Sequence, residues 1–309
     1  IFEAARQSSA TVPDVTTCFD ILLTQLADLP VLLCLDDLQF VDEQPALISF
    51  LQRLTAKSSV EKRPFLLMTS RRFPHFLTTT KQAELKGLSL EATRTLVANR
   101  QLPLTDELVA DLHEVTEGNG AFLTMATIVL KQAADPALLI ARLATTDDIE
   151  RFLLVEVNDR LTVQEQQVMM AVAILSGYLA ERDLLEWLLD QQTIRHVLRS
   201  LSDQYLLVAR DGENGRVYGQ HQILQAFYYL QPTSKQRAAL HSRAAEYFSS
   251  EGQDWYQAVF HYGKAGLVED AVRFAAEQFE QLVNQGVASL LLPMLQAIDE
   301  NRLPDNERL

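Results

Sequence analysis

The feature that most constrains the fold is an unbroken apolar run, VLLCL at residues 31–35, that ends directly in two adjacent aspartates. A short apolar run of this kind is typical of a strand buried on both faces of a parallel sheet. A second run, PFLLM at residues 64–68, follows a segment of helical spacing at residues 44–58. Together they predict a βαβ unit of a parallel, helix-covered sheet, to which AELKGLS at residues 83–89 would add a weaker third strand.

Beyond residue 90 the pattern changes to helices, so the predicted fold class is α/β followed by all-α. Three helices fill residues 91–148. Residues 149–232 are mostly helical but end in two short strands around DGENG at residues 211–215, which predicts a β-hairpin. In residues 233–309 apolar and small residues recur at helical spacing in pairs of helices, which indicates a helix-hairpin repeat.

Composition narrows the class of protein. The chain of 309 residues is long enough for several domains, and its net charge of −14 is spread along the sequence. This acidic balance argues against direct nucleic-acid binding. No apolar run approaches the roughly 18 residues of a membrane span, so we expect no membrane contact. Cys18 and Cys34 are expected to be reduced, packed thiols in a cytoplasmic protein.

The two aspartates that end the first apolar run, Asp36 and Asp37, are the strongest chemical signal. Ligands of open α/β sheets bind at the carboxyl ends of the strands. Two adjacent buried acids repel each other unless a cation or a reacting water needs them. This is the Walker B arrangement, in which Asp36 would hold Mg²⁺ through water and Asp37 would orient the attacking water. The alternative is that both acids cap the following turn and helix.

The second apolar run also ends in polar residues, Thr69, Ser70, Arg71 and Arg72. A guanidinium at the carboxyl end of a strand could bind a γ-phosphate through bidentate hydrogen bonds. The alternative is a solvated pair of arginines at the start of a loop. The two strand ends together favour a nucleotide site more than either does alone.

Three segments, LLCLDDLQFVDE, FLLMTSRR and EVTEGNGAFLTMA, together resemble the signal-transducing ATPases with numerous domains (STAND), a group of AAA+-related NTPases. Within that group the sequence looks most like the bacterial maltose-regulator branch (MalT-like, LuxR-type). The resemblance implies the C-terminal part of a parallel P-loop NTPase sheet in residues 1–90, a helical lid in 91–148, a winged helix in 149–232 and a TPR-like helical arm in 233–309. It also implies ATP or ADP with Mg²⁺ as cofactors.

The resemblance assigns roles at the strand ends. Asp36 matches the Mg²⁺ acid and Asp37 the catalytic acid, while Gln39 and Asp42 match the polar positions that follow them. Arg71 matches the sensor arginine, and the adjacent Arg72 is the alternative.

In the lid, Gly118, Asn119 and Gly120 match a Gly-Asn-Pro segment, but glycine replaces the proline that packs near the adenine in the family, which leaves a base contact open. Without the resemblance, this segment is a flexible helix start. His221 matches a winged-helix histidine that reaches the β-phosphate of ADP. The alternative for His221 is a structural hydrogen bond at a strand-to-helix junction.

One expected motif, the phosphate-cradling loop GxxxxGK[ST], does not occur in the sequence. None of the first 30 residues is glycine, and the pair Gly263-Lys264 is followed by Ala265 in a predicted inter-helix loop. Either this sequence is a piece of a longer protein, or nucleotide binding has been lost. We expect the former, with no ATP turnover by this chain alone. A plain ATPase and a non-catalytic interaction scaffold are the alternatives to a nucleotide-controlled switch.

The remaining predictions concern partners. Arg195 and Arg199 lie one turn apart on a helix of the predicted winged helix, but the acidic surroundings favour a contact between domains over DNA binding. The resemblance implies nucleotide-dependent self-association and a protein or small-molecule inducer on the helical arm. We expect core packing for most aromatic residues of that arm: Tyr247, Phe248, Trp255, Tyr256, Phe260, Phe274 and Phe279.

Overall fold

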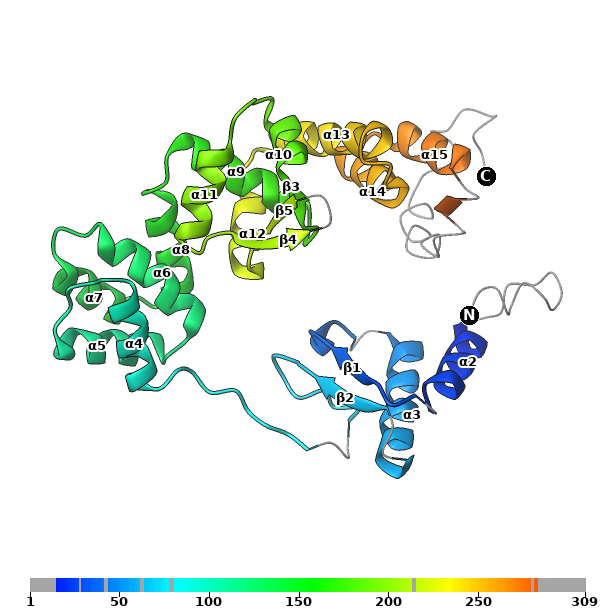
Figure 1. The fold of residues 1–309 in the computed structure, drawn as a ribbon, viewed down its shortest axis with the longest axis horizontal. Helices are drawn as coiled ribbons and strands as arrows, with labels where there is room; N and C mark the ends of the chain where they lie inside the picture. The colour runs from blue at the N-terminus through cyan, green and yellow to red at the C-terminus, as the bar shows by residue number, and fades with distance from the viewer. Residues whose placement is uncertain are drawn as a thin grey trace. The chain divides into compact units, whose positions relative to one another are not determined.

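The computed structural model describes residues 15–27, 29–41, 44–61, 64–77, 81–212, 215–278 and 281–282. The chain divides into two compact units, with the boundary between Leu85 and Lys86. The elements of both units are labelled in Figure 1. Within the described residues, no helix combines the length and apolar character that crossing a membrane requires.

The first unit contains the predicted βαβ arrangement. Its elements in chain order are α2 (Val15–Ala27), β1 (Leu32–Leu35), the 3-10 helix η1 (Leu38–Phe40), α3 (Pro45–Glu61) and β2 (Phe65–Met68). Strands β1 and β2 pair in parallel, with Leu32 opposite Phe65 and Leu35 opposite Met68. Helix α3 is the crossover connection that parallel strands need. The prediction of two parallel strands with a helix between them is confirmed.

The sheet of the first unit buries only one face in the described residues. Leu33 and Leu35 pack into an apolar cluster with residues of α2 and α3, because side chains alternate between the faces of a strand. On the other face Leu32, Phe65 and Leu67 are 61%, 59% and 54% exposed. The prediction that both faces are buried is therefore wrong for these residues.

Both cysteines are exposed, so the expectation of packed thiols is also wrong. Cys34 belongs to the open face of β1, where Leu32 is likewise exposed. Cys18 lies on α2 and is not one of the residues that pack in the apolar cluster.

The predicted third strand at residues 83–89 does not form. Residues 81–89 have no regular structure and are exposed. The backbone of Leu88 instead donates to the carbonyl of Gly118 at 2.8 Å. A Cβ added to Gly87 would lie 2.1 Å from the carbonyl oxygen of Glu117. Gly87 and Leu88 thus lie against the turn between α5 and α6, and do not pair with a strand.

The second unit begins with four helices, α4 (Leu90–Asn99), α5 (Asp106–Thr116), α6 (Gly120–Lys131) and α7 (Pro136–Ala144). Each of them starts at a polar residue whose side chain accepts a hydrogen bond from a backbone N–H of the first turn. These N-caps are Ser89, Thr105, Asn119 and Asp135. Such caps satisfy backbone donors that the helix itself leaves unpaired.

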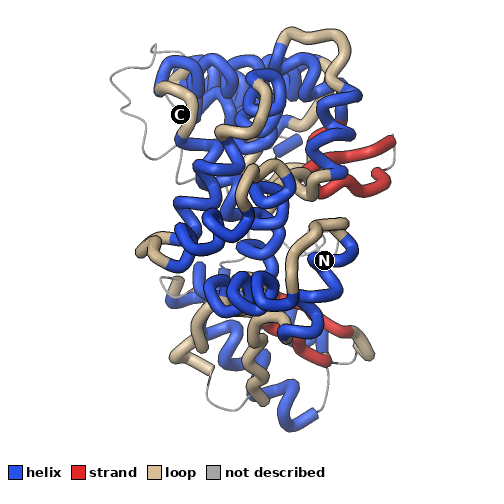
Figure 2. The backbone as a smooth tube through the Cα atoms, turned by 90° about the vertical axis from the view of Figure 1, so that its left-hand side faces the viewer, coloured by secondary structure: helices blue, strands red, loops and turns tan. Residues whose placement is uncertain are grey.

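The next part combines helices with a small antiparallel sheet. It contains α8 (Ile149–Asn158), α9 (Val163–Ile174), β3 (Ala180–Glu181), α10 (Arg182–Leu189), α11 (Arg195–Asp203), β4 (Val208–Gly212), β5 (Gly215–Gly219) and α12 (Gln222–Leu230). The strand order is β3-β5-β4, and Val208 lies opposite Gly219. The predicted hairpin is confirmed. Figure 2 shows the described strands in red and the helices in blue.

The chain continues as α13 (Ser234–Ser250), α14 (Trp255–Ala265) and α15 (Val268–Glu277). Helix α13 packs on α14, and α14 packs on α15. Phe248 is buried, while Tyr247, Trp255, Tyr256, Phe260 and Phe274 are partly buried and make ring contacts. Core packing is thus confirmed for these aromatic residues except Phe260, which belongs to no apolar cluster of the described residues, whereas Phe279 lies outside them.

One contiguous apolar core runs through most of the second unit, from Val97 in α4 to Ala258 in α14. Leu112, Leu153 and Leu198 are fully buried within it. The helices and the hairpin of this unit therefore pack as one body.

Candidate functional site at the strand ends

The parallel pairing of β1 and β2 places their carboxyl ends side by side. The amide of Thr69 donates to the carbonyl of Leu35 at 2.9 Å, and the amide of Leu38 donates to the carbonyl of Thr69 at 3.0 Å. These bonds extend the pairing beyond the last residues of the strands. The polar residues that follow each strand are consequently brought together, as the sequence predicted.

Asp36 is held by the segment after β2. The hydroxyl Oγ1 of Thr69 donates to Asp36 Oδ1. The amide of Asp37 donates to the same oxygen at 3.1 Å. Asp36 is exposed and Asp37 is half-buried, so the premise of two buried acids is wrong. Both acids instead lie at the carboxyl edge of the sheet, Asp36 exposed and Asp37 only partly covered.

Asp37 adopts a left-handed backbone conformation, with φ of 58°. It precedes η1, but its side chain makes no capping hydrogen bond to that helix. Its Oδ1 accepts a bond of 2.7 Å from Gln39 Nε2. The capping alternative is therefore not supported for Asp37, since its carboxylate is aligned by a side chain and not by the helix start.

Gln39 also contacts the loop after β2. Its Oε1 accepts from the backbone amide of Arg71 at 3.1 Å and from Ser70 Oγ at 3.3 Å. Arg71 and Arg72 are exposed at the start of this loop. The structure thus brings Asp36, Asp37, Gln39 and Arg71 into one strand-end cluster, whereas Asp42 lies outside the described residues.

Thr69 and Ser70 belong to the same cluster, although the sequence analysis assigned no role to either. Their hydroxyls bond Asp36 and Gln39 respectively. The available signal was their position directly after the second apolar run. The partner of each hydroxyl could not be deduced from spacing, because the two segments are more than thirty positions apart.

The cluster has the oxygen ligands that Mg²⁺ prefers. Mg²⁺ commonly takes only one or two carboxylates, and water and phosphate oxygens complete its shell. Asp36 and Asp37 fit this donor set. Within the described residues no group of three or more His, Cys, Asp or Glu side chains forms an all-protein metal site. The strand-end cluster thus offers two carboxylates that could hold a Mg²⁺ ion whose other ligands are water or phosphate oxygens.

The Gly118-Asn119-Gly120 segment forms the turn into α6. Gly118 has φ of 69°, and a Cβ there would lie 2.3 Å from the carbonyl oxygen of Leu88. The side chain of Asn119 accepts from the amides of Ala121 and Phe122 at 2.9 Å and 3.2 Å. Gly118 thus serves as a tight turn and Asn119 as a helix cap, which favours the alternative that this segment is a helix start. Gly120 has no atom within 4 Å of an added Cβ.

His221 is exposed and precedes α12 as its N-cap. Its Nδ1 accepts a bond of 3.4 Å from the amide of Ile223. A neutral ring that accepts at Nδ1 carries its proton on Nε2. The structural alternative therefore has a contact in its favour, and the same contact makes Nε2 a hydrogen-bond donor.

A second polar pair lies inside the helical arm and was not predicted. His241 Nδ1 and His261 Nδ1 are 2.8 Å apart, and His241 Nε2 is 3.4 Å from the hydroxyl of Tyr229. His241 is 1% exposed and His261 is fully buried. Burial lowers the pKa of His241 to about 4, helped by Lys264 and Arg237, and lowers the pKa of His261 to about 3. Both rings are thus neutral.

The hydrogen bonds indicate the tautomers of this histidine pair. His261 Nε2 is buried without a partner, and an unpaired acceptor is less costly to bury than an unpaired N–H. His261 therefore donates from Nδ1 to His241 Nδ1, and His241 donates from Nε2 to Tyr229. The ring of His261 stacks on Phe248, with centroids 5.6 Å apart. Because both rings are buried and bonded to neighbouring side chains, the pair has a structural role.

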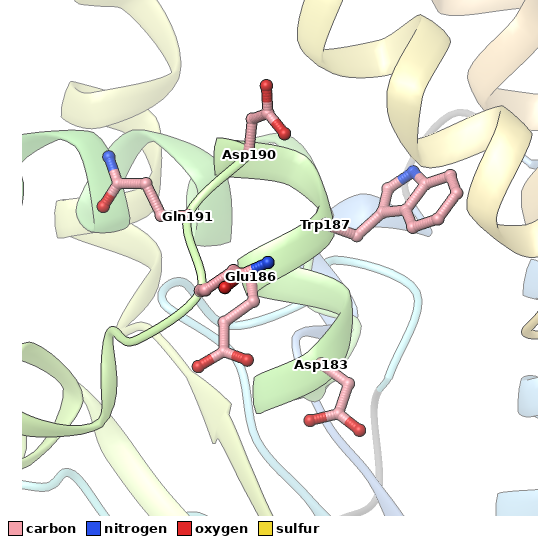
Figure 3. A pocket seen from close by; sticks show the side chains of 6 residues that line it. Asp183, Glu186, Trp187, Asp190 and Gln191 are labelled. Carbon is pink, nitrogen blue, oxygen red and sulfur yellow. The ribbon is translucent and has the colours of Figure 1, made fainter.

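An open pocket of about 430 Å³ lies beside α10 (Figure 3). Its lining residues are Asp183, Glu186, Trp187, Asp190, Gln191 and Gln192. Arg182 pairs with Asp183 and Glu186 at 3.1 Å and 3.6 Å, and Arg243 pairs with Asp190 at 3.5 Å. The acids are thus neutralised within the chain, and the pocket does not match the predicted site.

The fold is similar to that in the crystal structure of a signal transduction ATPase with numerous domains (STAND) protein with a tetratricopeptide repeat sensor from Pyrococcus horikoshii. The sequences are 18% identical, the TM-score is 0.69, and the match covers 92% of this chain and 42% of that chain. No protein-family model matches the sequence, and no curated protein matches it significantly. The chain spans about two fifths of that STAND protein. The predicted STAND-type resemblance is confirmed at the level of the fold.

Proposed function

We propose that this chain is part of an ATP- or ADP-controlled signalling switch of the STAND type. The observation that carries the proposal is the strand-end cluster, in which Thr69 bonds Asp36 and Gln39 links Asp37 to Arg71. Acids and a cationic loop at the carboxyl edge of a parallel sheet are what a Mg²⁺–nucleotide ligand needs. The similarity of fold to a STAND ATPase supports this choice over other nucleotide-binding proteins.

The roles of the strand-end residues follow from their chemistry. A bound Mg²⁺ would neutralise phosphate charge during transfer. Asp36 would hold it through water, and Asp37 would orient the attacking water. Arg71, or its neighbour Arg72, would bind the γ-phosphate oxygens. Asp42 is proposed as a further polar contact, as the resemblance implies.

The second unit would sense which nucleotide is bound. We assign His221 the role of donor to the β-phosphate of ADP, because its Nδ1 already accepts from Ile223 and leaves the proton on Nε2. Gly118, Asn119 and Gly120 would contribute the turn of the lid. Residues 149–232 have the helix and hairpin content of a winged helix, which we propose acts as a nucleotide lock and not as a DNA reader.

The helical arm would receive the input. Helices α13 to α15 stack in sequence order, as in helical repeats that present extended binding surfaces. We propose a protein or small-molecule inducer there, and self-association in the ATP-bound state. The output would be transcriptional or another form of signalling.

A non-catalytic interaction scaffold is the second candidate. The observation in its favour is that the sequence contains no GxxxxGK[ST] loop. The contacts of Gly118 and Asn119, which are satisfied without a nucleotide, also fit it.

The test is ATP turnover by the intact gene product, provided that it carries a phosphate-binding loop. Asp37→Asn keeps the size of the side chain but removes its charge. We expect at least about 100-fold slower turnover with ATP·Mg²⁺ binding retained. Asp147→Asn, at an exposed acid of the second unit, is the matched control and should change neither. The 309-residue chain alone should show no turnover.

Two results would contradict the switch. Asp37→Asn with parental turnover would remove the proposed catalytic role of Asp37. An intact protein that does not bind ATP or ADP would favour the scaffold.

A further inference from the structure

We propose that Gln39 is a positioning residue that couples the loop after β2 to the second acid, Asp37. One end of its amide donates to Asp37 Oδ1 at 2.7 Å, and the other end accepts from the backbone amide of Arg71 at 3.1 Å. The consequence for regulation, that the nucleotide state would affect Asp37 through Gln39, rests on the proposed function. The positioning of Asp37 by Gln39 does not, since it concerns only these hydrogen bonds.

The backbone around Gln39 is fixed independently of its side chain. Leu38 is 3% exposed, and its amide donates to the carbonyl of Thr69 at 3.0 Å. The amide of Phe40 donates to the carbonyl of Asp37 at 3.1 Å. Gln39 is itself half-buried within η1. The side chain therefore spans from a rigid helical turn to the loop, and its amide forms a bridge between two segments that lie apart in the sequence.

A primary amide can do this at neutral pH, whereas a carboxylate or a thioether cannot. Its NH₂ donates to a carboxylate, while its oxygen accepts from a backbone N–H. A glutamate would keep the acceptor for Arg71, but it would place a second negative oxygen against Asp37. A protonated glutamic acid would restore a donor. A methionine would fill a similar volume and make neither strong bond.

The charged residues of the two segments that meet at Gln39 are Asp36 and Asp37 after β1, and Arg71 and Arg72 after β2. Asp37 faces the donor end of the amide, and the Arg71 backbone faces the acceptor end. A change in the loop when a phosphate arrives or leaves would therefore be passed to the Asp37 carboxylate. Gln39 would make the alignment of the attacking water depend on the nucleotide state.

The first experiment measures hydrogen exchange of the Arg71 amide by NMR in the 309-residue chain, without nucleotide. In Gln39→Met the loss of one neutral hydrogen bond, worth about 1 kcal/mol, should lower protection of this amide about 5-fold. In Gln39→Glu protection should be retained, because the introduced carboxylate still accepts. Gln52→Met is the matched control, since Gln52 bonds the carbonyl of Phe76 in the same unit. It should leave Arg71 unchanged.

The second experiment measures ATP turnover by the intact gene product against pH. Gln39→Met should be slower than the parent at every pH. Gln39→Glu should be slowest relative to the parent at neutral pH and should recover relative to it as pH falls, because the protonated side chain donates again. If Gln39 served folding alone, the ratio of Gln39→Glu turnover to parental turnover would not change with pH, and the melting temperature of Gln39→Glu would be lower.

Unchanged protection of Arg71 in Gln39→Met would overturn the inference, and so would a flat ratio in Gln39→Glu. If the parent protein has no ATP turnover but Gln39→Met still exposes the Arg71 amide, the proposed function fails and the positioning role of Gln39 is supported. The exchange measurement thus separates failure of the inference from failure of the proposed function.

Discussion

Two hydrogen-bonded groups of polar side chains, the strand-end cluster around Asp36 and the histidine pair His241–His261, differ in what encloses them. Asp36 is exposed at the edge of a sheet, whereas His241 and His261 are buried between helices and packed against aromatic rings. The exposed acid is open to a cation, while burial keeps the imidazoles neutral. Polar residues in contact with one another therefore indicate a site only where a ligand can reach them.

The two units show a related contrast in their apolar cores. The second unit closes one contiguous core around residues such as Leu112 and Leu198. In the first unit, only one face of the β1–β2 sheet is covered in the described residues, and Leu32 and Phe65 lie on the open face. The strand-end cluster thus lies in the unit with the smaller core.

The largest effect is expected from removing both acids. In the intact gene product, Asp36→Asn with Asp37→Asn should abolish ATP turnover, a loss of at least about 100-fold. The melting temperature should stay near that of the parent, because both changes keep the side-chain volume and Asn tolerates the left-handed backbone of residue 37. Steady-state assays beside thermal melts measure both. Turnover equal to that of the parent would show that the strand-end cluster, like the histidine pair, has only a structural role.

Next in size is a core truncation in α3. Leu54 is fully buried, so Leu54→Ala should lower the free energy of unfolding by about 2–5 kcal/mol. Leu32→Ala is the control on the open face and should change it by less than about 0.5 kcal/mol. Denaturant titrations compare the two. Equal losses would mean that the open face of the sheet is covered in solution.

The histidine pair should make stability depend on pH. Both pKa values lie below the ordinary value of about 6.5, so the unfolded chain binds more protons in acid. Stability should be full above pH 6.5 and be lost as pH falls toward 4, by up to about 1.4 kcal/mol per pH unit for each histidine. Chemical unfolding at several pH values measures this slope.

A double variant tests the origin of that slope. His241→Leu with His261→Leu should flatten it, whereas His196→Gln, at an exposed histidine of α11, should leave it unchanged. A slope that survives in the double variant would assign the pH dependence to other groups.

The smallest effect concerns the turn into α6. Asn119→Ala removes a cap and should cost about 1 kcal/mol of stability. Gly120→Ala should be tolerated, because an added Cβ meets no atom within 4 Å. Unfolding curves paired with ADP titrations of the intact protein separate the two roles. Weaker ADP binding by Asn119→Ala at unchanged stability would show that Asn119 contacts the nucleotide and is more than a cap.

The sequence allowed the main elements to be predicted, because apolar periodicity and turn residues are local signals. The parallel strands, the hairpin at residues 211–215 and the meeting of the polar residues that follow β1 and β2 all follow from such signals. The prediction of a third strand at residues 83–89 was wrong. Its weak apolar pattern did not reveal that no strand would lie beside it.

Contacts between distant segments could not be predicted in the same way. Thr69 bonds Asp36 across 33 positions, and His241 meets His261 across 20. Neither pairing leaves a pattern in a single sequence. The open face of β1 was missed for the same reason, because a run of apolar residues does not say whether both faces have partners.

The most direct test of the account is to locate the metal. Fe²⁺ replaces Mg²⁺ in many oxygen-ligand sites, and with ascorbate and peroxide it cleaves the backbone close to where it is bound. In the intact gene product with ATP, we predict cleavage after the two strands, near Asp36–Asp37 and near Thr69–Ser70, and its suppression by excess Mg²⁺. ATP-dependent cleavage confined to other parts of the chain would contradict the assignment of the strand-end cluster as the nucleotide site.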